Sequence, residues 1–84
     1  MSKATKPINV LYFAIMKDES GVDSETIETN VETPLELYKE IQKKYHLTIE
    51  PEKLIVAIND EMSSWQEQLN ANDTVAFLPP VAGG

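Results

Sequence analysis

The segment with the clearest chemical potential is the end of the sequence, Leu-Pro-Pro-Val-Ala-Gly-Gly at residues 78–84. Two consecutive prolines remove two backbone donors and restrict φ, so a strand before them must end and the tail must leave the domain. Glycines let the backbone pass through a channel too narrow for a Cβ atom. The carboxylate of Gly84 is then an unhindered acyl group, which a partner could activate with ATP and load with sulfur. The alternative interpretation is an inert terminus, as many domains have.

Cysteine, histidine and paired carboxylates, which form most catalytic and metal sites, are absent from this sequence or too few to form one. The sequence has no cysteine, which excludes disulfides, thiolate ligands and a cysteine nucleophile. His46 is the only histidine, and we expect it to be solvated near the end of a helix. The carboxylate pairs Asp60–Glu61 and Glu50–Glu52 lie in predicted turns without further ligands, so we expect solvated charge and no metal site. Trp65 can either mark a binding face or close the edge of the sheet, and we favour closure of the core.

The charge balance excludes several classes of partner. Seven lysines stand against fourteen acidic residues, for a net charge of −7, and arginine is absent. Such a protein repels phosphate backbones and anionic membrane surfaces, so we expect neither nucleic acid nor membrane as a partner. The acidic residues are concentrated between Lys17 and Lys39: Asp18, Glu19, Asp23, Glu25, Glu28, Glu32 and Glu36. Each alone is typical of a solvated face, and together they favour a partner with a basic surface.

Hydrophobic periodicity predicts four strands and one helix. Residues 8–16 are read as a strand with two apolar faces, residues 17–21 as a polar turn and residues 24–31 as a second strand. Thr33, Pro34 and Glu36 form the N-terminal signature of a helix that ends near His46. Further strands are expected at residues 54–58 and 74–78, whereas residues 62–69 are ambiguous.

This order of elements predicts an α+β protein with a mixed sheet packed on one main helix. The first two strands should form an antiparallel hairpin, and the first and last should pair in parallel, because a helix-containing crossover separates them. The result is a β-grasp arrangement. We expect a disordered extension at residues 1–7, the β-grasp domain at residues 8–78 and a flexible reactive tail at residues 79–84. With no cysteine and no secretory leader pattern, the expected compartment is the cytoplasm.

Strand alternation also predicts a docking surface. If Val10, Tyr12 and Phe77 face the helix, Phe13 and Leu78 point outward and can form an apolar patch with Met62. A contiguous apolar patch on so acidic a protein indicates a partner.

Four segments resemble the small, sulfur-carrier subunit of molybdopterin synthase: INVLYFA from Ile8, TPLELYKEI from Thr33, LIVAIND from Leu54 and TVAFLPPVAGG from Thr74. The resemblance covers residues 8–84 and implies a ubiquitin-like β-grasp fold. By position, Gly83 and Gly84 correspond to the functional diglycine of that family. Phe13, Met62 and Leu78 fall where the family places apolar contacts to its partners. We also assign the tail residues Pro79, Pro80, Val81 and Ala82 to partner binding.

The resemblance also implies a mechanism. In that family an E1-like enzyme uses ATP to adenylate the C-terminal glycine, and a sulfur donor converts it to a thiocarboxylate. The tail then enters the large catalytic subunit and gives its sulfur to a pterin precursor during molybdenum cofactor biosynthesis. Two small and two large subunits form a heterotetramer. The chain would thus be a non-catalytic subunit with no bound cofactor.

Two alternatives remain open at the level of sequence. One is a related carrier, either a thiamine-type sulfur carrier or a ubiquitin-like modifier. The other is an interaction domain with an inert tail. The sequence also departs from the family in two places. Many relatives have an arginine after the first strand, where this chain has Ile15-Met16-Lys17-Asp18 and Lys17 is a weaker substitute. Residues 1–7 also extend beyond the compact start common in the family.

Overall fold

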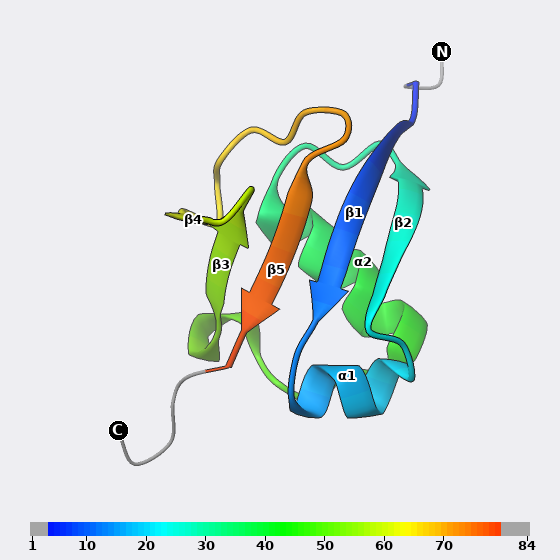
Figure 1. Ribbon diagram of the computed structural model, residues 1–84, viewed down its shortest axis with the longest axis vertical. Coiled ribbons are helices and arrows are strands. Elements are labelled where there is room, and N and C mark those ends of the chain that lie inside the picture. The colour runs from blue at the N-terminus through cyan, green and yellow to red at the C-terminus, as the bar shows by residue number, and fades with distance from the viewer. Residues whose placement is uncertain (1–3, 80–84) are drawn as a thin grey trace.

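The computed structural model describes residues 4–79 as a mixed sheet with a long helix against one face (Figure 1). The strands are β1 (Lys6–Tyr12), β2 (Ser24–Thr29), β3 (Ile55–Ile58), β4 (Glu61–Ser63) and β5 (Thr74–Leu78). The helices are α1 (Ile15–Ser20), α2 (Pro34–Tyr45) and the 3-10 turn η1 (Pro51–Lys53). The sheet order is β2-β1-β5-β3-β4, with β1 and β5 parallel and the other pairs antiparallel. The predicted ubiquitin-like β-grasp fold is confirmed.

The hydrophobic core lies between α2 and the sheet. Leu37, Tyr38 and Ile41 of α2 are fully buried, and so is every second residue along the central strands, namely Ile8, Val10, Val75 and Phe77. Full burial of a side chain of this size contributes about 1.5–3 kcal/mol. Trp65 closes one side of this core, as predicted, by stacking on Phe77 with ring centroids 5.6 Å apart.

Helix α2 begins and ends where the sequence predicts. Thr33 is the N-cap, and its hydroxyl accepts a hydrogen bond from the Glu36 backbone N–H at 3.3 Å. The Glu36 carboxylate reaches back to the N–H of Glu32 at 2.8 Å, one residue earlier than in the usual capping box. His46 ends the helix in the left-handed region at φ 58°.

The prediction of one strand over residues 8–16 is wrong beyond Tyr12. β1 ends at Tyr12, and most of the expected polar turn at residues 17–21 lies instead in α1, which ends at Ser20 and in which Met16 is completely buried. The chain turns at Ala14, with φ 55° and ψ −130°, and the Met16 N–H donates to the Phe13 carbonyl at 3.1 Å. Residues with a Cβ disfavour this conformation, at a cost of about 1–3 kcal/mol. The turn was not predicted because Ala14, and not a glycine, occupies the position with the glycine-like conformation.

Several strand limits also differ from the prediction. β1 begins at Lys6, so Lys6 and Pro7, which the sequence assigned to an N-terminal extension, pair with Thr29 and Glu28. β2 ends at Thr29, two positions before Val31, and β3 begins at Ile55, because η1 precedes it. Residues 62–69, which the sequence left ambiguous, begin within the short strand β4 and continue as irregular backbone. Within residues 4–79 no helix is both long and apolar enough to cross a bilayer.

Candidate functional site

The face of the sheet opposite α2 is apolar at its centre. Leu11 lies opposite Ala76, Ala76 opposite Ala57, and Ala57 opposite Met62, so these four residues form one row across four strands. The row belongs to the set of strand positions that alternate with the buried ones, because successive side chains point to opposite faces. The apolar character of both faces of β1 and β3 is the sequence signal for this surface.

We call this surface the open-face patch and define it as Leu11, Phe13, Ile55, Ala57, Met62, Ala76 and Leu78. Met62 is the most accessible member at 77% exposure, and Phe13 and Ile55 are 42% and 40% exposed. The other members are half-buried. The structure thus brings Phe13, Met62 and Leu78, predicted from the sequence, to an extended apolar surface. It adds Leu11, Ile55 and the two alanines, which the sequence analysis did not single out.

A shallow hollow of about 410 Å³ lies at one corner of the patch. Leu11 and Phe13 line it together with Lys17 and Asp23. The Lys17 ammonium and Asp23 carboxylate are 2.9 Å apart, and this hydrogen bond raises the pKa of Lys17. Lys17 is therefore held at the rim of the hollow.

The tail starts at the same surface. Leu78 is the last residue of β5, and half-buried Pro79 follows it. The remaining tail residues named by the sequence analysis, Pro80, Val81, Ala82, Gly83 and Gly84, lie outside the described residues. The structure therefore places the start of the tail beside the patch.

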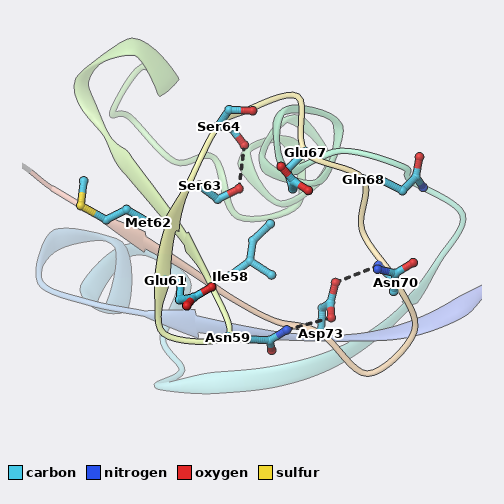
Figure 2. Close-up of a pocket in the computed structure, with 10 residues that line it drawn as sticks. All are labelled: Ile58, Asn59, Glu61, Met62, Ser63, Ser64, Glu67, Gln68, Asn70 and Asp73. Atoms are coloured by element: carbon cyan, nitrogen blue, oxygen red, sulfur yellow. Dashed lines mark hydrogen bonds between the residues drawn. The ribbon is translucent and has the colours of Figure 1, made fainter.

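A second hollow, at the β4 edge, carries carboxylates (Figure 2). Glu61, Glu67 and Asp73 line it, but Asp73 is engaged in the fold, because its two oxygens accept from the Asn59 side chain at 3.0 Å and the Asn70 N–H at 2.8 Å. Among residues 4–79 no three His, Cys, Asp or Glu side chains are grouped as a metal site requires. The hollow is bordered by the tight turn between β3 and β4, in which Asn59 and Asp60 both have positive φ.

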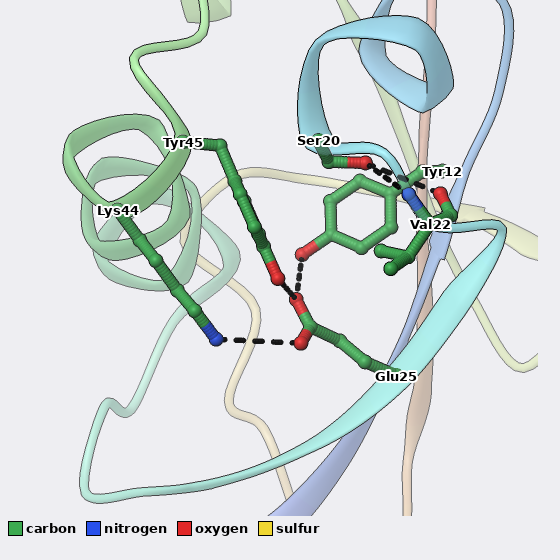
Figure 3. A network of polar contacts seen from close by, with 6 residues as sticks. All are labelled: Tyr12, Ser20, Val22, Glu25, Lys44 and Tyr45. Atoms are coloured by element: carbon green, nitrogen blue, oxygen red, sulfur yellow. Dashed lines mark hydrogen bonds and ion pairs between the residues drawn. The ribbon is translucent and has the colours of Figure 1, made fainter.

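Two members of the acidic segment have structural partners that the sequence analysis did not foresee. Glu19 accepts from both the N–H and the hydroxyl of Thr48, at 2.9 and 2.6 Å, and these bonds lower its pKa. Glu25 accepts from the phenols of Tyr12 and Tyr45 and from Lys44 (Figure 3). Burial acts to raise the pKa of Glu25, but these hydrogen bonds outweigh it, and the net pKa is lowered. The expected solvated acidic face therefore does not include Glu19 and Glu25, whose carboxylates bind other residues of the fold.

Comparisons with known proteins agree with this architecture. The chain is 34% identical over 80 residues to the molybdopterin synthase sulfur carrier subunit of Haemophilus influenzae, covering 92% of this chain and 99% of that protein. The human protein of that name is 35% identical over 82 residues, with 92% and 93% coverage. A Helicobacter pylori complex of subunits 1 and 2 of the molybdopterin-converting factor matches with a TM-score of 0.65 and 24% identity, over 93% of this chain and 99% of that chain.

The family assignment rests on nearly the whole chain. The model of the ThiS family matches residues 10–84, a span that includes the open-face patch and the diglycine. The two relatives at 34% and 35% identity match over 92% of the chain. The chain therefore belongs to the ThiS family, together with the sulfur carrier subunits of molybdopterin synthase.

Proposed function

We propose that the chain carries sulfur on Gly84 for molybdenum cofactor biosynthesis, in the cytoplasm, as the non-catalytic subunit of a molybdopterin synthase. The observation that supports this most directly is the identity of 34% and 35% to molybdopterin synthase sulfur carrier subunits over 92% of the chain. The chain has no cysteine, so the terminal carbonyl is the group on which a transferable sulfur could be formed.

The acyl chemistry needs two partners besides the large subunit. In the first step a carboxylate oxygen of Gly84 attacks the α-phosphorus of ATP on an E1-like enzyme, and pyrophosphate leaves. In the second, the terminal sulfur of a persulfide on the donor attacks the acyl carbon, and AMP leaves, which gives an acyl disulfide. A second thiol on the donor then attacks the donor's sulfur in that disulfide, so that a disulfide forms within the donor and the thiocarboxylate leaves. The role of this chain is to present an unhindered acyl carbon on a narrow tail.

The open-face patch is the proposed docking surface for the large subunit. Its apolar side chains lie on the sheet face that α2 leaves uncovered, and β5 leads directly from this face to Pro79. The Helicobacter pylori complex pairs a chain of the same fold with a second subunit. We propose a heterotetramer of two small and two large subunits, with Gly83 and Gly84 reaching the catalytic site.

Intact-mass spectrometry tests the proposal. The chain is incubated with ATP, an activating enzyme and a sulfur source, and then with the large subunit and the pterin precursor. The expected result is a mass gain equal to replacement of one oxygen by sulfur at Gly84, reversed as the dithiolene forms. Sulfur on an internal residue would exclude the carrier mechanism. An isopeptide bond between Gly84 and a lysine of another protein would instead favour the ubiquitin-like modifier.

A further inference from the structure

The Glu25 carboxylate is the centre of a polar cluster that joins three elements (Figure 3). It accepts from the Tyr12 phenol of β1 at 2.6 Å, the Tyr45 phenol of α2 at 2.7 Å and the Lys44 ammonium of α2 at 3.3 Å. Its side chain is only 19% exposed. The two phenol rings also meet edge to face, with centroids 5.8 Å apart. We call Tyr12, Glu25, Lys44 and Tyr45 the Glu25 cluster.

The cluster borders the strained turn that carries Phe13. Tyr12 is the last residue of β1, and Ala14, two positions later, has the glycine-like φ of 55°. Strained backbone of this kind persists only where the surrounding structure determines it from both sides. On one side Tyr12 is fixed by its phenol and by its N–H, which donates to the Asp23 carbonyl at 2.9 Å. On the other side Met16 is fully buried.

The residues between these two anchors are the exposed ones. Phe13 and Ile15 are each 42% exposed, while Tyr12 and Met16 are 2% and 0% exposed. Phe13 belongs neither to the hydrophobic core nor to the side chains packed against it, so the position of its ring depends on the two anchors. A flexible Phe13 would have to lose more side-chain and backbone entropy on binding than one held in place.

We infer that the Glu25 cluster is a positioning device, which holds the Phe13 turn in the shape that docks to the large subunit. This inference rests on the proposed function of the open-face patch. It assigns Glu25 and Tyr12 a role in association although neither belongs to the patch. Glu25 acts through Tyr12, and Tyr12 acts through the backbone of the turn.

A matched pair of variants separates positioning from stability. Tyr12→Phe removes the phenol that binds Glu25, and Tyr38→Phe removes a phenol of the same kind that donates to the Ile49 carbonyl at 2.6 Å, far from the turn in sequence. Both variants lose one hydrogen bond and keep the ring. We expect Tyr12→Phe and Glu25→Gln to weaken association with the large subunit by about tenfold, and Tyr38→Phe by less than about twofold, at a temperature where all are folded.

A double-mutant cycle then shows whether Glu25→Gln weakens association through Phe13 or through the patch as a whole. Glu25→Gln is combined with Phe13→Ala and, separately, with Met62→Ala, and the dissociation constants are measured by calorimetry. We expect coupling of about five- to tenfold with Phe13 and additive behaviour with Met62. Tight binding by Tyr12→Phe, or equal coupling to both positions, would overturn the inference while the docking surface stands. If neither Phe13→Ala nor Met62→Ala weakened association, the docking surface and the inference would both fall.

Discussion

Ile55 of β3 lies directly opposite Leu78 of β5, as the last antiparallel pair before the chain reaches Pro79. Pro79 has no N–H to donate, so the strand ladder stops there. Both residues belong to the open-face patch. The point at which the tail leaves the sheet is therefore held by the same pair that forms part of the proposed docking surface, and a partner bound there finds the start of the tail in a defined place.

The most exposed member of this surface gives the most direct test of docking. Met62→Asp should shift the free energy of unfolding by less than about 0.5 kcal/mol, because Met62 is 77% exposed. It should nevertheless weaken association with the large subunit by about tenfold or more, since a carboxylate would lose its water in an apolar interface. Gln66→Glu changes the net charge equally from an exposed position outside the patch and is the control. Equal loss of binding in both variants would indicate a long-range charge effect instead.

The length and width of the tail can be tested without altering the sheet. One residue added after Gly84 moves the acyl carbon by up to about 3.3–3.6 Å, whereas a misplacement of about 1 Å can cost 100-fold in rate. Gly83→Val widens the tail and restricts its backbone. We expect either change to abolish adenylation, sulfur transfer or both, with binding to the large subunit retained. Full dithiolene synthesis by the extended chain, shown by mass to be untrimmed, would favour an inert tail.

Ala14 should limit the stability of the domain. Its φ of 55° and ψ of −130° suit glycine, so Ala14→Gly should raise the free energy of unfolding by about 1 kcal/mol despite the greater freedom of glycine in the unfolded chain. Ala57→Gly, in the regular strand β3, should instead lower it by about 0.5–1 kcal/mol. Urea unfolding measures both. Loss of stability in Ala14→Gly would mean that the methyl group contributes more by packing than it costs in strain.

Stability should fall in alkaline solution, in part because of Tyr38. Burial, with smaller contributions from the Glu19 and Glu50 charges, raises the pKa of Tyr38 from its ordinary value of 10.0 to about 12. The unfolded chain therefore releases this proton near pH 10, while the folded chain keeps it to about pH 12, and stability is lost across that interval. Urea unfolding at about pH 9 and about pH 11 should show a smaller loss in Tyr38→Phe than in the parent. If the parent and Tyr38→Phe lost the same unfolding free energy, the alkaline loss of stability would come from other tyrosines, such as Tyr12.

The parts of the fold that the sequence predicts are those with strong local signals. Thr33 and Pro34 specify the start of α2 chemically, and Pro79 specifies the end of β5. The parallel pairing of β1 with β5 followed from the crossover between them. Leu78 could be placed on the outer face because its neighbour Phe77 is an unmistakable core residue.

The parts that could not be predicted depend on tertiary contacts. Nothing local marks the end of β1, since Phe13, Ala14 and Ile15 continue the apolar run and Ala14 occupies a conformation that sequence patterns reserve for glycine. Met16 is buried through a helix that the strand alternation concealed. Glu25 looked like any other acidic residue of its segment, because its phenol partners lie on β1 and α2 and only the fold brings them together.

The position of β5 in the sheet has a consequence for folding. β5 lies between β1 and β3, so it joins the β1–β2 hairpin to the β3–β4 hairpin. Its partners on β1, such as Val10 opposite Val75, are distant in sequence, and bringing them together costs loop-closure entropy before any packing energy is gained. We therefore expect the sheet to close late in folding, and the open-face patch, which spans both hairpins, to form only then. A partner that recognises this patch would accept only carriers that have finished folding.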